Sequence, residues 1–268
     1  MGNKKYYNIY NIEKLGQVFT PEYIVENMIS LIKNGSNILE PSVGDGAFYK
    51  KLKNITGIEI DKKFCPDKCL NIDFFDYNID NKHDTIIGNP PYVAFKHILP
   101  ETKSKLDMNL FDNRSNLFLF FIYKCFKHLT NNGEIIFITP PDFLKSTSSI
   151  KLNNILYKNG TITDYYEYTD VSIFNNFSPN VSIWRYEKNN FTRKTKTKKG
   201  IKNFENINGQ LIFSNNTYDL NFKDYFTVKV GGVSGMDKIF TNKNGNKSFV
   251  CSYTNKTGEL KKMYYNIE

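Results

Sequence analysis

The sequence Ile87-Gly-Asn-Pro-Pro-Tyr92 continues from residues 83–87, whose apolar end predicts a short buried strand. Each proline lacks an N–H, fixes its own φ and pushes the residue before it into an extended conformation. The carbonyls of Asn89 and Pro90 therefore cannot join a helix and must find donors elsewhere. With the Asn89 side-chain oxygen they form a set of acceptors at the carboxyl end of a strand, where open α/β sheets bind ligands.

This set of acceptors suits a planar group that carries an NH2. The oxygens would accept the two N–H hydrogens, and the Tyr92 ring would stack on the face of the group. An Asn-Pro-Pro sequence alone is more often a simple turn, so its meaning depends on the residues that precede it.

The preceding residues predict short strands that each end in a polar or glycine-containing loop. The predicted strands are residues 37–40, 55–60 and 68–72, and the loops after them contain Gly44 and Gly46, Glu59 and Asp61, and Asp73 and Phe74. A helix is predicted before them, with Thr20 as its N-cap and Pro21 as its first residue. This alternation of strands with short helices, one of them at residues 48–52, predicts an α/β fold whose parallel sheet has helices on both faces.

Further elements are predicted after Tyr92. They are a mobile loop at residues 97–113, helices at 116–129 and 143–156, and strands at 134–139, 162–168 and 181–186, the last of the sheet. Residues 193–200 then contain no apolar side chain, which is typical of a solvated linker, although such a basic run can also lie along phosphates. The predicted organisation is an α/β domain at residues 1–190, a basic linker at 191–203 and a β-rich unit at 204–268.

Composition narrows the classes of partner. The net charge of +9 favours a polyanionic partner. Cys65 and Cys69 lack a second Cys or His pair nearby, so we expect no metal site. No apolar run reaches the length of about 18 residues that a membrane span needs, and no secretory signal is visible. We therefore expect a reduced, cytoplasmic protein without a membrane partner.

The loops after the first three strands indicate the kind of ligand. Residues 40–46 could form a dinucleotide-binding loop, but Tyr49 stands where the third glycine would be. The pattern suits a nucleoside without a pyrophosphate: Glu59 would accept from the ribose hydroxyls, Asp73 from an exocyclic amine, and Phe74 would lie against adenine. S-adenosylmethionine is the common cofactor that fits.

Five motifs occur in a fixed order: Gly16-Gln-x-Phe-Thr-Pro21, Glu40-Pro-x-x-Gly-x-Gly46, Gly57-Ile-Glu-Ile-Asp61, Asp73-Phe74 and Asn89-Pro-Pro-Tyr92. Together they resemble the N6-adenine DNA methyltransferases of restriction–modification systems, in the gamma, TaqI-like arrangement. The resemblance covers residues 12–187 and continues weakly at residues 230–240, which look like the opening of a DNA-specificity domain. It implies a Rossmann-like seven-stranded S-adenosylmethionine-dependent methyltransferase fold with a small C-terminal β-rich unit.

The resemblance also implies roles for individual residues. Those expected to bind the cofactor are Thr20, Pro21, Glu40, Ser42, Gly44, Gly46, Glu59, Asp73, Phe74, Asn89 and Pro91. Asn89, Pro90 and Tyr92 are expected to receive an adenine flipped out of double-stranded DNA. Phe174 or Phe177 is expected to stack on the other side of that base; the sequence favours Phe174, and both could instead be core residues.

The tail after residue 204 is much shorter than the specificity domain of the family. The resemblance therefore implies either a truncated target-recognition domain or a partner specificity or restriction subunit. A protein-glutamine N5-methyltransferase shares Asn-Pro-Pro-Tyr but lacks the Phe-Thr-Pro element and the basic tail. An RNA adenine methyltransferase and a non-catalytic DNA-binding remnant stay open as further alternatives.

Overall fold

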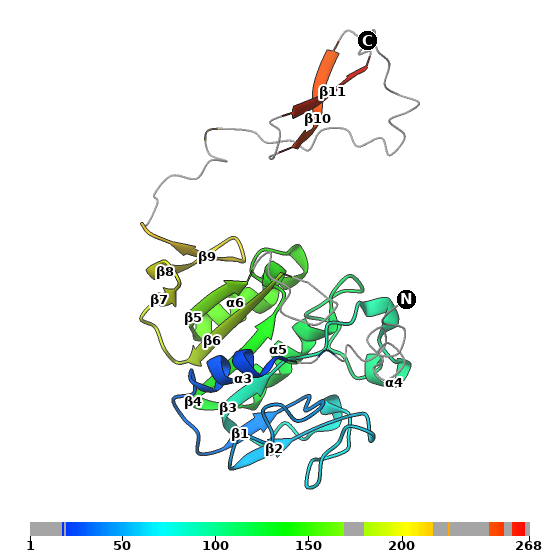
Figure 1. Cartoon of the computed structure of the whole chain (residues 1–268), viewed down its shortest axis with the longest axis vertical. Coiled ribbons are helices and arrows are strands. Elements are labelled where there is room, and N and C mark those ends of the chain that lie inside the picture. Colours follow the sequence, from blue (N-terminus) through cyan, green and yellow to red (C-terminus); the bar gives the residue numbers. More distant parts are fainter. Residues whose placement is uncertain are drawn as a thin grey trace. The chain divides into compact units, whose positions relative to one another are not determined.

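The computed structural model describes Val18, residues 20–168 and 180–216, Tyr225, and the backbone of residues 247–254 and 259–265. The chain forms two compact units, Met1–Thr217 and Tyr218–Glu268. The first contains a nine-stranded sheet with helices (Figure 1). In the second, β10 (Lys247–Thr254) and β11 (Glu259–Tyr265) form an antiparallel pair.

The sheet of the first unit has the strand order β2-β1-β3-β4-β6-β5-β7-β8-β9. Its strands are β1 (Ile38–Glu40), β2 (Ile55–Gly57), β3 (His83–Gly88), β4 (Leu129–Thr139), β5 (Gly160–Tyr168), β6 (Val181–Lys188), β7 (Lys194–Thr197), β8 (Gly200–Ile207) and β9 (Gln210–Ser214). The α-helices among the described residues are α3 (Glu22–Ile29), α4 (Pro100–Lys103), α5 (Leu117–His128) and α6 (Ile150–Asn159). Short 3-10 helices are η1 (Phe74–Asp76), η2 (Phe95–His97), η3 (Pro141–Leu144) and η4 (Thr147–Ser149).

Strand directions bring several strand ends to one edge of the sheet. β1, β2, β3 and β4 are parallel, whereas β6 is antiparallel to both β4 and β5. β7 is parallel to β5. Strands β1, β3, β4, β5 and β7 therefore all end at the same edge, which we call the carboxyl edge.

Two buried clusters cover the two faces of the sheet. Successive side chains of a strand point to opposite faces, and β3 shows this directly: Ile86 belongs to the cluster around α5, and Ile87 to the cluster around α3. Helix α5 begins at the N-cap Asn116, whose side chain accepts from the Phe118 N–H. Because most of its residues are apolar, α5 is buried on most of its sides.

Several predicted elements differ in the structure. Residues 68–72 form no strand, because only Leu70 pairs with the sheet, through a single parallel bridge to Ile58. Residues 44–51 form successive turns instead of a helix. The predicted mobile loop contains α4, and it packs through the buried side chains of Thr102, Leu106 and Phe111. Several of its apolar residues face the core, although Met108 is exposed, and the sequence pattern did not indicate this packing.

The predicted linker is wrong, because β7 and β8 continue the sheet there, so that Val181–Lys188 is not its last strand. The alternation of lysine and threonine in β7 is the two-residue period of a strand. Lys194 and Lys196 are exposed, whereas Thr195 is buried and its hydroxyl donates to the Ile162 carbonyl. The boundary between the two units lies after Thr217, further along the chain than predicted.

None of the helices in the described residues has the length and apolar character that a membrane crossing requires.

Candidate functional site

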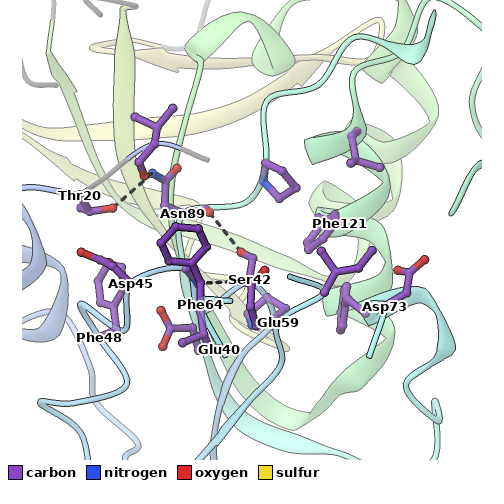
Figure 2. A pocket seen from close by; sticks show the side chains of 18 of the residues that line it. Thr20, Glu40, Ser42, Asp45, Phe48, Glu59, Phe64, Asp73, Asn89 and Phe121 are labelled. Atoms are coloured by element: carbon purple, nitrogen blue, oxygen red, sulfur yellow. Dashed lines mark hydrogen bonds between the residues drawn. The ribbon is translucent and has the colours of Figure 1, made fainter. Parts of the chain in front are cut away.

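A cavity with about 1000 Å³ of empty space, part of it open to solvent, lies at the carboxyl ends of β1 and β3. The residues that line it come from the loops after β1, β2 and β3, from the segment before α3, and from the region of α4 and α5: Val18, Thr20, Glu40, Pro41, Ser42, Val43, Gly44, Asp45, Ala47, Phe48, Glu59, Ile60, Phe64, Asp73, Phe74, Asn89, Pro91, Ile98, Leu99, Thr102, Leu117 and Phe121. Thr20 and Asn89 lie at one end of this cavity, and Asp73 and Phe121 at the other (Figure 2).

Two hydrogen bonds fix the orientation of the Asn89 side-chain amide, so that its oxygen points away from Val18 and Thr20. Its Nδ2 donates to the Val18 carbonyl at 3.4 Å and to Thr20 Oγ1 at 3.2 Å. The Val18 carbonyl can only accept, so the NH2 must face it and Oδ1 must point the other way. That buried Oδ1 has no hydrogen-bond partner among the described residues. Since a buried acceptor left unpaired is costly, Oδ1 is suited to a ligand donor.

Thr20 therefore orients Asn89 and does not cap a helix. The residue at the N-cap of α3 is Pro21, and no side chain caps that helix. The backbone of Asn89 is also fixed, because Ser42 Oγ donates to its carbonyl at 3.1 Å (Figure 2).

Tyr92, three residues after Asn89, is anchored through both its hydroxyl and its ring. Its hydroxyl donates to the Ile138 carbonyl at 2.7 Å, and its ring meets Phe118 edge-on with 5.9 Å between the centroids. Burial raises the pKa of Tyr92 well above its usual value, so the hydroxyl stays protonated. Neither Tyr92 nor the buried Pro90 is among the residues that line the cavity.

The loop after β1 is tied to the end of β2 by Glu59. The Gly44 N–H donates to Glu59 Oε2 at 2.7 Å, and the Asp61 N–H donates to Oε1 at 2.9 Å. Gly44 has a φ of +55°, a left-handed conformation that glycine adopts without steric cost. The structure thus gives Glu59 a second task, because it shapes the glycine loop in addition to facing the cavity.

The cavity is acidic although the whole chain is basic. Burial raises the pKa of Glu40 well above its usual range, and the nearby Asp45 adds to this. Burial also raises the pKa of Asp45 and of Glu59. Glu40 Oε2 is buried and has no hydrogen-bond partner in the described part of the chain. A cationic ligand would reverse these shifts, whereas a polyphosphate would be repelled.

Asp73, at the far end of the cavity, is held by α4. Its Oδ2 accepts from Thr102 Oγ1 at 2.8 Å and from Lys105 Nζ at 3.1 Å, and its Oδ1 accepts from the Phe75 N–H at 2.9 Å. Asp73 caps η1 and does not end a strand. Thr102 lies in α4 and Lys105 follows it, so this helical segment fixes Asp73 at the far end of the cavity. Both donors lie in the predicted mobile loop.

Aromatic rings form the wall beside Asp73. Phe74 packs on Phe121 with 5.0 Å between ring centroids, and Phe64 lines the cavity between its two ends (Figure 2). The sequence predicted Phe74 but not Phe64 or Phe121. Phe121 was assigned to the apolar helix, where no sequence signal separates a core ring from a ring that also lines a cavity.

The structure brings most of the predicted cofactor residues to one cavity: Thr20, Glu40, Ser42, Gly44, Glu59, Asp73, Phe74, Asn89 and Pro91. Pro21 and Gly46 do not line it. The sequence missed Asp45, Phe64, Thr102 and Phe121. Phe174 and Phe177 lie outside the described residues. No group of three or more potential metal ligands occurs among the residues that the structure describes.

Comparison with known proteins identifies the family to which this chain belongs. The Eco57I restriction-modification methylase family matches residues 23–174, which is more than half of the chain. The chain belongs to this family. Among curated relatives, the type II methyltransferase M.HincII of Haemophilus influenzae is 33% identical over 207 residues, covering 72% of this chain and 39% of the relative. M.TthHB8I of Thermus thermophilus is 29% identical over 174 residues, covering 57% of this chain and 41% of the relative.

This Eco57I-family chain spans about two fifths of the length of these curated relatives. Among solved structures, the methyltransferase subunit of a type I restriction-modification system from Streptococcus thermophilus has a TM-score of 0.53 and 17% identity. The match covers 74% of this chain and 50% of that one. The predicted Rossmann-like methyltransferase fold is thus confirmed. The predicted third strand is reduced to one bridge, and β7, β8 and β9 extend the sheet.

S-adenosylmethionine is the cofactor of this fold, and the residues present fit it. Its sulfonium and ammonium groups are cationic, which matches the buried carboxyl group of Glu40 and the half-buried one of Asp45. Its adenine matches the aromatic wall beside Asp73, and its ribose the position of Glu59 between the two ends (Figure 2). When bound, the cofactor supplies an electrophilic methyl group.

Replacing Glu59 with alanine should weaken S-adenosylmethionine binding by about 1.5–3 kcal/mol, the range for hydrogen bonds to a charged group. The change removes an acceptor from the cavity and frees the Gly44 and Asp61 N–H groups. Isothermal calorimetry measures the effect, and an unchanged melting temperature would exclude loss of fold as its cause. Equal affinity in Glu59→Ala and wild type would remove Glu59 from the site.

Replacing Thr102 with valine should weaken cofactor binding by about 0.5–1.5 kcal/mol, the net value of one hydrogen bond. The change keeps the shape of the side chain but removes the donor that orients Asp73. Ser104→Ala is the matched control, because the exposed Ser104 hydroxyl donates only to the Glu101 carbonyl of the same turn. If both variants bind the cofactor equally, Thr102 does not position Asp73.

Proposed function

We propose that this protein transfers the methyl group of S-adenosylmethionine to N6 of an adenine in double-stranded DNA, as the modification component of a restriction–modification system. The observation that carries the proposal is the unpartnered, buried Oδ1 of Asn89 at the end of the cofactor cavity. An oxygen in that position selects a substrate that donates N–H hydrogens. Membership of the Eco57I restriction-modification methylase family supports DNA as the molecule that presents this donor.

In this proposal the work of the site is positioning and electrostatics. Asn89 Oδ1 and the Pro90 carbonyl would accept the hydrogens of the adenine NH2, so that electron density shifts toward the attacking nitrogen. As the new N–C bond forms, the bond between the methyl group and sulfur would break, and the methylated nitrogen would release one proton to solvent. Thr20 and Ser42 fix the side chain and the carbonyl of Asn89, so the acceptors are in place before the substrate arrives. No residue needs to change its protonation state for the nitrogen to become a better nucleophile.

An adenine in duplex DNA is stacked and paired, so it must leave the helix before its N6 can reach Asn89. Tyr92 is the proposed stacking partner for the extruded base. Its hydroxyl bond to the Ile138 carbonyl fixes the ring, which would lower the entropy cost of stacking. Phe174 and Phe177 remain candidates for the opposite face of the base.

The proposal assigns further roles to the rest of the chain. The second unit, residues 218–268, would be the opening of a target-recognition domain, and a separate specificity or restriction subunit would be a partner. DNA as substrate also implies that the protein acts in the cytoplasm.

The deciding experiment incubates the protein with methyl-labelled S-adenosylmethionine and, in parallel reactions, double-stranded DNA, RNA and a protein extract. Nucleoside analysis of the product should give N6-methyl-2′-deoxyadenosine. A 2-aminopurine at the target position should brighten on binding as the base leaves the stack. Label in cytosine, RNA or protein would contradict the proposal, and cofactor binding without transfer to any acceptor would identify a non-catalytic remnant.

A further inference from the structure

The turn between β7 and β8 brings a group of lysines to the carboxyl edge. β7 is parallel to β5 and ends at Thr197, so Lys198 and Lys199, which follow it, lie at the same edge as Asn89. Lys196 lies one residue before the end of β7. These three lysines are exposed, and we call them the edge lysines.

The edge lysines are available to an external anion. None of them forms an ion pair within the described part of the chain, whereas Lys33, Lys51 and Lys105 do. Lys198 is partly ordered, because its Nζ lies 4.0 Å from the centre of the Tyr168 ring and donates to the Glu167 carbonyl at 3.0 Å. The ring and the carbonyl hold the ammonium group in one place, so a preformed contact point for an anion stands at this position.

The position of the edge lysines relative to Asn89 suits a duplex. The strand order places β7 four strands from β3. Neighbouring strands are about 4.8 Å apart, so the edge lysines lie on the order of 20 Å from Asn89 along the edge. DNA carries one phosphate charge for about every 1.7 Å of helix axis. A duplex that lies along the edge with its target base at Asn89 would therefore bring backbone phosphates to the edge lysines.

We propose that Lys196, Lys198 and Lys199 form a contact surface for the phosphate backbone of DNA on the flank of the target base. This inference rests on the proposed function, because it takes DNA as the substrate. This surface does not contribute to sequence specificity, because contacts to phosphates carry no information about the bases. It holds the duplex along the carboxyl edge, so the catalytic unit contributes to DNA binding in addition to the second unit.

The test uses the full chain and a fluorescein-labelled duplex of mixed sequence, with binding measured from low to moderate salt. Changing all three edge lysines to glutamine should lower the affinity at low salt by about tenfold or more. It should also reduce the slope of log affinity against log salt by about 0.9 for each phosphate that the variant no longer neutralises. Affinity for S-adenosylmethionine should not change, because none of the three lines the cofactor cavity.

A matched control removes the same charge from the opposite edge of the sheet. Lys53, Lys127 and Lys158 are exposed and lie just before the starts of β2, β4 and β5. Their change to glutamine should leave the salt slope near that of wild type, and arginine at the three edge positions should restore it. Equal slopes in the edge and control variants would overturn the inference alone. If wild type itself binds no DNA, the proposed function fails as well.

Discussion

Asn89→Ala should reduce the rate of methyl transfer by about a hundredfold or more while leaving S-adenosylmethionine affinity nearly unchanged, as loss of one preorganised polar contact does elsewhere. The change removes the Oδ1 that has no partner in the described residues. The oxygens on which the cofactor is expected to depend, those of Glu40, Glu59 and Asp73, stay in place. Single-turnover transfer from labelled cofactor to DNA measures the chemical step, and calorimetry measures cofactor binding.

Two further variants separate the acceptor from its support. Thr20→Val removes one partner of the Asn89 amide, so the oxygen stays but is less well oriented, and the rate should fall less than in Asn89→Ala. Asn132→Ala replaces an exposed asparagine of β4 and should transfer at the wild-type rate. A wild-type rate in Asn89→Ala would show that this oxygen is not the acceptor that the reaction needs.

Arg185→Met should lower the free energy of unfolding by about 3–5 kcal/mol, which is the usual cost of leaving a buried charge without its partner. The side chains of Arg185 and Glu134 are each only 2% exposed, and Arg185 Nε donates to Glu134 Oε2 at 2.6 Å. The guanidinium also donates to Thr163 Oγ1 at 2.8 Å and to Glu187. Removing it would leave Glu134 buried beside backbone donors that cannot neutralise its charge.

Urea unfolding of three variants tests the role of this ion pair. Glu134→Gln combined with Arg185→Met should be more stable than Arg185→Met alone, because the amide still accepts from Thr85 Oγ1 and from the Lys33 and Asn34 N–H groups. Lys33→Ala removes an ion pair between the exposed Lys33 and the half-buried Glu187 and should cost less than about 1 kcal/mol. If Arg185→Met and Lys33→Ala destabilise the protein equally, the buried pair does not carry the stability assigned to it.

The regular elements with strong local patterns were predictable from the sequence. The strand before Asn89, the helix capped by Asn116 and the strand that ends at Thr139 are all present. The lysine and threonine alternation at residues 194–197 has the period of a strand, but its charge indicated a linker. It forms a strand because β5 offers a free edge and a buried place for Thr195, and a local pattern carries neither fact.

The sequence predicted which residues form the site, but it did not predict which residues contact them. The motif order placed Thr20, Glu40, Glu59, Asp73 and Asn89 at one sheet edge, and the structure brings them to one cavity. The partners of these residues were not predictable. Thr102 and Lys105 reach Asp73 from a segment about thirty residues further along the chain, a contact that depends on how α4 packs.

The sequence by itself determined the family, the sheet edge that carries the site and the carboxyl and amide residues that line the cavity, because these follow from residue types at fixed spacings along single strands and loops. Only the tertiary structure decided that Thr20 orients the Asn89 amide, that α4 holds Asp73, that Tyr92 is anchored to Ile138, and that the edge lysines lie at the same sheet edge as the site. Each of these depends on strand order and on packing between segments far apart in the chain, and neither has a local signature in the sequence.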